Sequence, residues 1–318
     1  VPGLVDPHAH MWPTWGIHKT QIWMYHANLA YGVTTTRDPQ TSQTDVITYG
    51  DMVDAGMMVG PRVYSTGPGV FGDYANDRIR DMDHAKNIIR RYSDYYDTKT
   101  VKMYMAGNRE QRQWVIMAAR EAGLMVTTEG GLDLMYNLTM MIDGYSGQEH
   151  SFPIFPLYKD VVHLTAETGI TYTPTLLVSY GGPFGEGYFL TRENPHDDEK
   201  LRRFTPHSVI DDRTRRRSTG GAGWFLEEEH VFQEHAKVIK AVLEAGGRAG
   251  VGSHGQLQGL GYHWELWAMA SGGLNEHDAL RAATIYGAES IGLGKEVGTL
   301  EVGKLSDLVV LDADPFEV

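Results

Sequence analysis

The sequence lacks cysteine altogether, which limits the chemistry open to the protein. Disulfides, thiolate metal ligands and cysteine nucleophiles are excluded, because each requires a thiol. Positive charge is also scarce, since 28 basic residues face 41 acidic ones and the formal net charge is −13. A general role in nucleic-acid binding is therefore not expected, because phosphate recognition needs a positive field.

Long apolar segments and a leader sequence are missing as well. No run of eighteen consecutive apolar residues occurs, so no membrane-spanning helix is predicted. The chain opens on Val1-Pro2-Gly3-Leu4, without a basic region, a signal core or an initiator methionine. We therefore expect further residues to precede this segment. The cellular location stays open between the cytoplasm and the periplasm or extracellular space.

Short apolar runs rich in β-forming residues alternate with helical patterns along the chain. This alternation indicates a parallel sheet, and eight strands indicate closure into a TIM-type (β/α)₈ barrel, here assigned to residues 1–296. A doubly wound open sheet is disfavoured, because no G-x-G-x-x-G motif follows the first strand. The strand candidates are Leu4–Pro7, Val33–Arg37, Arg62–Thr66, Val101–Met105, Met125–Thr128, Gly144–Glu149, Thr171–Val178 and Arg248–Gly252, and the clearest helical patterns are Asp81–Tyr96, Arg109–Ala122, Leu157–Thr168 and Leu226–Ala245.

One stretch interrupts this repeat. Residues 181–223 follow the seventh predicted strand and form a long, charged insert that contains glycine and proline. Loops after barrel strands lie on the carboxyl-terminal face, so the insert is expected either to form a wall of the active site or to be a solvated insertion. Its run Arg213-Thr214-Arg215-Arg216-Arg217 could clamp an anionic group, although surface solvation is the simpler interpretation.

The pattern changes again after the barrel. Val297–Lys304 and Asp307–Leu311 are predicted to form a β-hairpin within residues 297–318. A two-stranded hairpin is marginal by itself and needs a sheet to join. Because no other strands are free, we expect its partner strands to precede Val1 in the intact protein or to come from another chain.

Two histidines close the first predicted strand. In His8-Ala9-His10 the imidazoles are two positions apart, so both project from one face of the strand. At the carboxyl end of a barrel strand this direction leads into the active-site mouth. Two neutral imidazoles placed in this way suit Zn²⁺ or a similar divalent ion. Asp6 is a candidate to orient one of these ligands, with a purely structural role as the alternative.

Four further polar side chains lie in or at the ends of later predicted strands. Lys102 lies inside the apolar fourth strand, where a lysine is unfavourable unless it is paired, deprotonated or chemically altered. Carbamylation by CO₂ would convert it into a carboxylate able to bridge two metal ions. Glu129, His150 and His254 end the fifth, sixth and eighth strands. A single histidine is most often structural, but six such side chains at strand ends predict a common site.

The remaining histidines are not needed for that site. His263 follows His254 by nine positions and is a candidate for substrate contact, with a structural role equally compatible. Five others lie on predicted helices or in the charged insert and are expected to be solvated, namely His84, His196, His207, His230 and His235.

Four ordered motifs resemble those of the amidohydrolase superfamily. Pro2–His10 is similar to its P-G-[LI]-[IV]-D-x-H-x-H opening, and Gly32–Asp38 to its second-strand G-[VI]-T-[TS]-x-R-D. Ala279–Ala288 resembles its A-L-x-x-A-T-x-x-[GP]-A helix, and Gly298–Leu311 its G-x-[IL]-x-x-G-K-x-A-D-L-[VI] ending. The resemblance implies a TIM-type barrel with a small β-sandwich built from both chain ends.

Some segments look closer to the imidazolonepropionase-like branch in which the barrel follows a TolB-like β-propeller. By position, the resemblance implies that His8 and His10 are first-strand metal ligands, Lys102 the carbamylated lysine and His150 the sixth-strand ligand. Two positions depart from the commonest pattern. Glu129 stands where a histidine is usual, and His254 where the proton-accepting aspartate is usual, which leaves the general base open between these two.

The expected activity is hydrolysis of an amide or cyclic-amide C–N bond of a small molecule by a metal-activated water. One or two zinc ions are expected, with iron, manganese or cobalt as alternatives, held by His8, His10, Lys102, Glu129, His150 and His254. A peptidase, lactonase or phosphoesterase of the same fold is the first alternative, and a non-catalytic binding or assembly module the second. A homo-oligomer, or a longer chain with an upstream domain, is expected.

Overall fold

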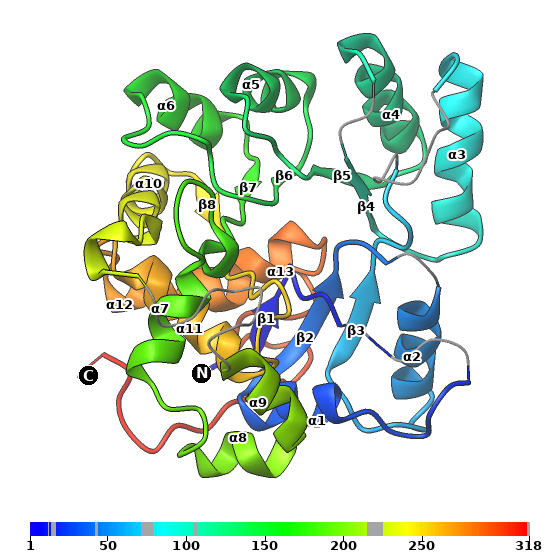
Figure 1. The fold of residues 1–318 in the computed structure, drawn as a ribbon. Helices are drawn as coiled ribbons and strands as arrows, with labels where there is room; N and C mark the ends of the chain where they lie inside the picture. The colour runs from blue at the N-terminus through cyan, green and yellow to red at the C-terminus, as the bar shows by residue number, and fades with distance from the viewer. Residues whose placement is uncertain are drawn as a thin grey trace.

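A computed structural model describes residues 1–11, 13, 17–41, 44–70, 79–104, 107–214 and 225–316. Its strands pair in parallel throughout, as two sheets of order β1-β2-β3 and β4-β5-β6-β7-β8. The strands are β1 (Leu4–Asp6), β2 (Val33–Asp38), β3 (Arg62–Ser65), β4 (Thr100–Met103), β5 (Met125–Thr128), β6 (Gly147–Gln148), β7 (Thr171–Tyr172) and β8 (Arg248–Ala249). Figure 1 shows β1–β3 below and β4–β8 above.

Backbone hydrogen bonds close both gaps between the two sheets. After β3, Val70 forms a parallel bridge with Met103 of β4, in which the Val70 N–H donates to Lys102 O at 2.8 Å. After β8, the His254 N–H donates to His8 O at 2.7 Å. The eight strands therefore form the TIM-type barrel predicted from the alternating pattern.

Helices surround the strands and connect them (Figure 1). Among the described residues, no helix is both long and apolar enough to cross a lipid bilayer. The helices are α1 (Trp23–Ala30), α2 (Asp45–Asp54), α3 (Met82–Asp94), α4 (Arg109–Glu121), α5 (Leu134–Asp143), α6 (Lys159–Glu167), α7 (Gly185–Arg192), α8 (Glu199–Phe204), α9 (His207–Thr214), α10 (Phe232–Glu244), α11 (Leu260–Ala270), α12 (Glu276–Arg281) and α13 (Gly287–Ser290), with short 3₁₀ turns at Leu176–Val178 and Glu227–Glu229 and a π-helical turn at Ala282–Tyr286.

Side-chain caps explain where the well-predicted helices begin. Before α4, Asn108 accepts a hydrogen bond from the Gln111 N–H at 3.0 Å, and the Gln111 side chain accepts one from the Asn108 N–H at 2.8 Å. Before α3, the Asp81 carboxylate accepts from the His84 N–H at 2.8 Å. These contacts satisfy amide groups that the first helical turn leaves without partners.

The largest buried apolar cluster lies between the late strands and helices α10 and α11. It includes Tyr172 of β7, Ala249 of β8, Val242 of α10 and Trp264 of α11, all with 0% exposure. His230 and His235 are buried at the edge of this region, with 8% and 2% exposure. The expectation that these two histidines are solvated was therefore wrong, because they pack against aromatic side chains such as Phe155 and Phe232.

The first five predicted strands agree with the structure to within about one residue at each described end, and Met105 of the fourth lies outside the described residues. The sixth is shorter than predicted, because Gly144 takes φ +90° and ends helix α5. The seventh was wrong beyond Tyr172, because Pro174 has no N–H for a strand ladder and Thr175 adopts φ +49°.

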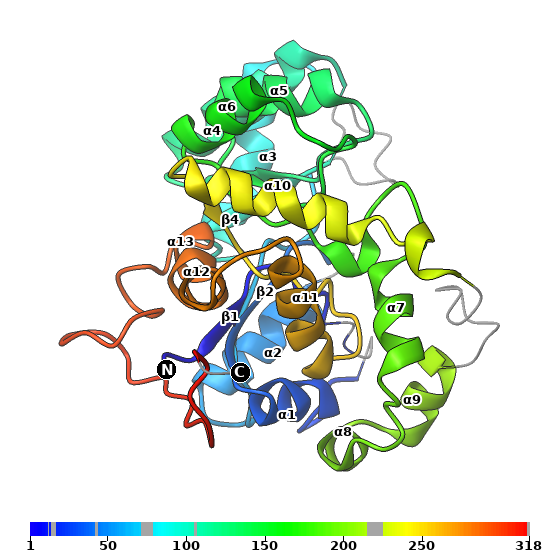
Figure 2. The ribbon, with the colours of Figure 1, turned by 90° about the vertical axis from the view of Figure 1, so that its left-hand side faces the viewer.

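The insert after β7 is largely helical where it is described. Helices α7, α8 and α9 lie within residues 185–214, and Figure 2 shows them packed along one side of the barrel beside α1. Of the two alternatives for the insert, this part does not fit a solvated one, because Asp198 caps α8 and apolar residues such as Leu201 and Ile210 are buried. Arg215, Arg216 and Arg217, and the insert from 215 to 223, lie outside the described residues.

The hairpin expected within 297–318 is not formed in its described part, up to residue 316. Instead, Leu308 forms an antiparallel bridge with Pro2, and Val1 and Val309 exchange hydrogen bonds of 3.0 Å. Figure 2 shows both chain ends side by side. The C-terminal segment pairs with the start of the chain because neither stretch has a sheet of its own to join.

Candidate metal centre

His8 and His10 follow β1 and lie at the carboxyl-terminal end of the barrel. Both are buried, and their ring centroids are 5.2 Å apart. Asp6 fixes the local backbone, because its Oδ1 accepts hydrogen bonds from the His8 N–H at 3.1 Å and the Ser253 N–H at 3.2 Å. Asp6 is therefore a structural link between β1 and the loop after β8, within the range of roles predicted for it.

Carboxylates hold the outer nitrogens of both imidazoles. His8 Nδ1 lies 2.9 Å from Glu149 Oε2, and Glu149 Oε1 in turn accepts from Arg37 at 2.6 Å. His10 Nδ1 lies 3.2 Å from Asp38 Oδ1. A carboxylate at Nδ1 keeps the proton on that nitrogen and leaves Nε2 as a lone-pair donor.

The inner nitrogen of His8 is an unpaired polar atom in a buried place. Among the described residues, His8 Nε2 has no hydrogen-bond partner, and the side chain has 0% exposure. Burial, and after it the charge of Lys102, lowers the pKa of His8 well below its usual range. A buried neutral imidazole with its lone pair unmatched has the chemistry of a metal ligand.

His150 and His254 bring two more imidazoles to the same place. The His150 ring centroid lies 5.1 Å from that of His8, and the His254 centroid lies 5.1 Å from His8 and 4.7 Å from His10. Ligand nitrogens of His8, His10 and His254 all lie within 4.8 Å of one another. Three imidazoles so grouped match the donor set that binds zinc and related ions.

Strained backbone positions two of the residues that form this group. His254 adopts φ +59° in the loop after β8, and Thr175 adopts φ +49° after β7. Thr175 Oγ1 lies 2.6 Å from His150 Nδ1 and so orients that ring. Glu265 of α11 holds the next turn by accepting hydrogen bonds from the Leu176 and Leu177 N–H groups at 2.8 and 2.9 Å. Such outliers are typical of functional sites.

Lys102 and Glu129 form an ion pair beside the histidines. Lys102 of β4 has no exposed surface, Glu129 is partly exposed at 23%, and Lys102 Nζ lies 2.5 Å from Glu129 Oε2. Glu129 Oε1 lies 3.2 Å from His150 Nε2. Burial alone would raise the pKa of Glu129, but Lys102 and His150 hold it well below its usual range. The pair is thus in contact with the histidine group through His150.

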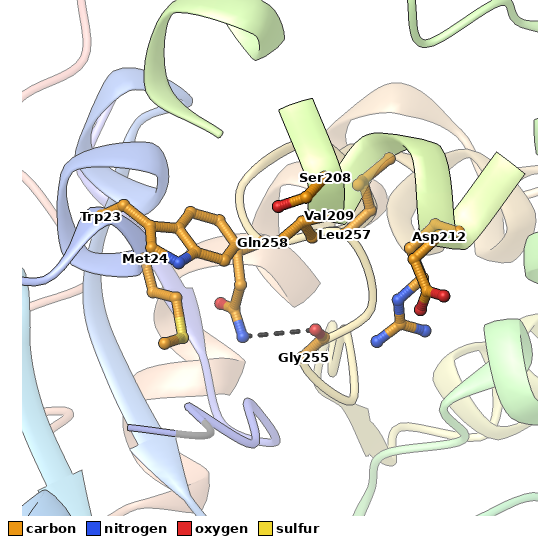
Figure 3. Close-up of a pocket in the computed structure, with 9 residues that line it drawn as sticks. Trp23, Met24, Ser208, Val209, Asp212, Gly255, Leu257 and Gln258 are labelled. Carbon is orange, nitrogen blue, oxygen red and sulfur yellow. Dashed lines mark hydrogen bonds between the residues drawn. The ribbon is translucent and has the colours of Figure 1, made fainter. Parts of the chain in front are cut away.

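A cavity of about 550 Å³ adjoins the centre between helices α1 and α9 and the loop after His254. Figure 3 shows Trp23 and Met24 on the α1 side, Ser208 and Asp212 on the α9 side, and Gln258 and Gly255 between them. The Gln258 side chain donates to His10 O at 2.8 Å and to Gly255 O at 3.2 Å. Gln258, in the wall of the cavity, is therefore hydrogen-bonded to the backbone of the candidate ligand His10.

Comparison with known proteins decides the family. The sequence pattern of the amidohydrolase family matches residues 1–318. The chain belongs to the amidohydrolase family. A stretch of 39 residues, 12% of this chain, is 62% identical to imidazolonepropionase of Symbiobacterium thermophilum but spans only 9% of that relative.

Two solved structures share the fold of this amidohydrolase. Molinate hydrolase matches with a TM-score of 0.69 and 16% identity, over 99% of this chain and 78% of its own. A Xaa-Pro dipeptidase with bound methionine matches with a TM-score of 0.65 and 18% identity, over 96% of this chain and 79% of its own. At these identities the likeness concerns the fold alone.

All six side chains predicted for the amidohydrolase site are brought to one end of the barrel. They form two groups in contact, one of His8, His10 and His254 and one of Lys102, Glu129 and His150. His263 belongs to neither group, and its Nε2 donates to Tyr31 O at 2.8 Å.

Sequence reasoning missed the residues that hold the candidate ligands in place. Asp38 and Arg37 stand in the second-strand motif, and Glu149 directly precedes His150, but none was assigned a role. Their signal was a charged side chain at the end of an otherwise apolar or threonine-rich strand. Thr175 carried no such signal, because nothing in its neighbours indicates a left-handed backbone.

Gly255 offers a direct test of how closely the His254 loop must approach His10. Its φ is +76°, and a Cβ added there would lie 2.1 Å from His10 O. Gly123 has φ +71° with nothing within 4 Å of such a Cβ, so Gly123→Ala carries only the backbone strain of about 1–2 kcal/mol. We expect Gly255→Ala to lower the free energy of unfolding by more than Gly123→Ala and to weaken metal binding. Urea denaturation and metal titration of both variants measure this, and equal losses would contradict the close approach.

Proposed function

We propose that this amidohydrolase cleaves an amide or cyclic-amide C–N bond of a small molecule with the help of one or two divalent ions. The observation that carries the proposal is the convergence of His8, His10 and His254, with the buried Nε2 of His8 lacking a partner among the described residues. Zinc suits this donor set best, and iron, manganese or cobalt can use the same ligands.

Each of the two groups of side chains would bind one ion. His8 and His10, fixed by Glu149 and Asp38, would hold one ion, and His150, Glu129 and Lys102 would hold or share a second. When bound, such an ion activates water at neutral pH and polarises the scissile carbonyl group.

His254 has two compatible roles in this proposal. Its ligand nitrogen lies within 4.8 Å of those of His8 and His10, so it can complete the first ion's donor set. Burial, and after it His10, lowers the pKa of His254 well below its usual range, so its imidazole is neutral with an available lone pair but is a weak proton acceptor. Glu129 is the other proton acceptor in reach, although Lys102 already stabilises its charged form.

Lys102 can adopt either of two states in this proposal. As an ammonium group it is paired with Glu129, and it also lies over the Tyr104 ring at 5.1 Å from its centroid. Carbamylation would place a second anion beside Glu129, which is favourable only with cations between them. We propose that Lys102 is an ammonium group in the metal-free protein and is carbamylated when metal is bound.

A chelation and reconstitution experiment tests the proposal. The protein is stripped with a chelator, reloaded with zinc, analysed for metal by mass spectrometry, and screened against N-acyl amino acids, dipeptides, cyclic amides, lactones and phosphoesters. We expect stoichiometric metal and turnover of C–N substrates that disappears on chelation. Hydrolysis of peptides, lactones or phosphoesters alone would assign another bond, and a protein that retains no metal would indicate a non-catalytic module.

A further inference from the structure

The cavity beside the candidate metal centre has walls of different chemistry. Trp23, Met24, Val209 and Leu257 supply apolar surface, whereas Arg213 supplies a guanidinium group and Asp212 a carboxylate. At about 550 Å³ it is in the size range of small-molecule sites. Figure 3 shows that it opens between two helices that are distant in sequence, α1 and α9.

The cavity lies next to the centre, although none of the six candidate site residues lines it. Gly255, in its wall, directly follows His254, and Gln258 links the wall to His10 O at 2.8 Å. The Gln258 side chain is itself held by Asn28, which donates to its Oε1 at 2.8 Å. A substrate whose scissile group lies at the metal centre therefore has this cavity as a neighbouring place for the rest of its structure.

Among the described residues, Arg213 is held in the cavity wall by long contacts to two partners. Its NH1 contacts Gln256 Oε1 at 3.2 Å and Glu186 Oε2 at 3.4 Å, both long for a charged donor. Gln256 and Glu186 are buried and bonded to each other at 2.8 Å, so they form a rigid support. The Arg213 side chain keeps 33% exposure. An arginine fork so placed suits a carboxylate, which it can bind through two parallel hydrogen bonds.

We propose that this cavity binds the carboxylate-bearing part of the substrate, with Arg213 as the ion-pair partner of that carboxylate and Trp23 as an apolar wall. The inference rests on the proposed function and narrows it to N-acyl amino acids and dipeptides rather than uncharged cyclic amides. Asp212 acts in the opposite direction to Arg213, since its exposed carboxylate repels an anion in the same cavity.

The test compares two ligands that differ in one charge. N-acetyl-leucine and its uncharged amide, N-acetyl-leucinamide, are titrated calorimetrically into metal-free portions of the protein and its variants, so that neither ligand is cleaved, and the remaining portions are loaded with zinc. We expect wild type to prefer the acid, and Arg213→Gln to weaken acid binding by about ten- to a hundredfold while amide binding stays unchanged. The affinity of Arg213→Lys for the acid should lie between those of wild type and Arg213→Gln, because lysine keeps the charge but lacks the planar guanidinium group. Asp212→Asn should tighten binding of the acid.

A control variant tests whether the effect is specific to Arg213, and metal and rate measurements test the proposed function separately from this inference. Arg192→Gln removes an exposed arginine of α7 that pairs with Glu227 at 3.1 Å, and it should leave both affinities unchanged. Thermal denaturation shows whether each variant is folded. Equal affinities for acid and amide in wild type, or equal losses for both in Arg213→Gln, would overturn the inference. Metal content and turnover are measured in the zinc-loaded portions, so failure of the proposed function shows there and not in the ligand preference.

Discussion

Replacing both His8 and His10 by alanine should abolish stoichiometric metal binding and lower turnover by several orders of magnitude. Two of the three grouped imidazoles are then absent, and His254 alone does not make a site. Metal activation of water and of the carbonyl group supplies several kcal/mol of transition-state stabilisation, and about 1.4 kcal/mol corresponds to a factor of ten in rate. Mass spectrometry of the bound metal and initial-rate measurements check both effects.

His163→Ala is the matched control for the double variant. His163 is exposed on α6 and belongs to neither group of candidate ligands, so its loss should change neither metal content nor rate. Retention of one metal equivalent by the double variant would show that the ion binds elsewhere. That result would remove the basis for the proposed hydrolysis.

Glu129→Gln should lower the free energy of unfolding of the metal-free protein by about 3–5 kcal/mol, the usual effect of breaking a buried ion pair. Lys102 has 0% exposure and would be left as a buried cation without its anionic partner. The double variant Glu129→Gln/Lys102→Met should recover most of this loss, because no buried charge remains. Turnover should stay low in both. Urea denaturation and rate measurements separate the two outcomes.

Glu121→Gln provides the control for that prediction. Glu121 pairs with Lys86 at 2.8 Å on the surface, where both side chains are exposed, so its loss should change stability by less than about 1 kcal/mol. If Glu129→Gln is no more destabilising than Glu121→Gln, Lys102 does not carry a positive charge in the metal-free protein. Carbon-13 spectra of protein treated with labelled bicarbonate would then show whether the lysine is carbamylated without metal.

Much of the barrel could be predicted from the sequence, because the spacing of residues along a strand and their place at its end determine where their side chains point. Residues two apart on a strand face the same side, so His8 and His10 could be paired from the sequence alone. Carboxyl ends of parallel barrel strands meet at one face, so Lys102, Glu129, His150 and His254 could be assigned to the same site although they are far apart in the chain.

Other features could not be predicted from the sequence, because they depend on contacts between segments that are distant in the chain. The helices of the insert depend on burial of Leu201 and Ile210 against the rest of the protein. The left-handed turn at Thr175 is held by Glu265, which lies ninety positions later in the sequence. The C-terminal segment, read from the sequence as a hairpin, instead pairs with Val1.

The sequence by itself determined the fold class, the types of candidate ligand and the face of the barrel on which they gather, because strand periodicity and the alternation of strands and helices can be read along the chain. Only the tertiary structure decided how those side chains are paired. It joins Glu149 to His8, Asp38 to His10 and Glu129 to Lys102, and it places Arg213 in a cavity beside His254. The tautomer of an imidazole and the charge of a buried lysine depend on such neighbours, and packing alone brings them together.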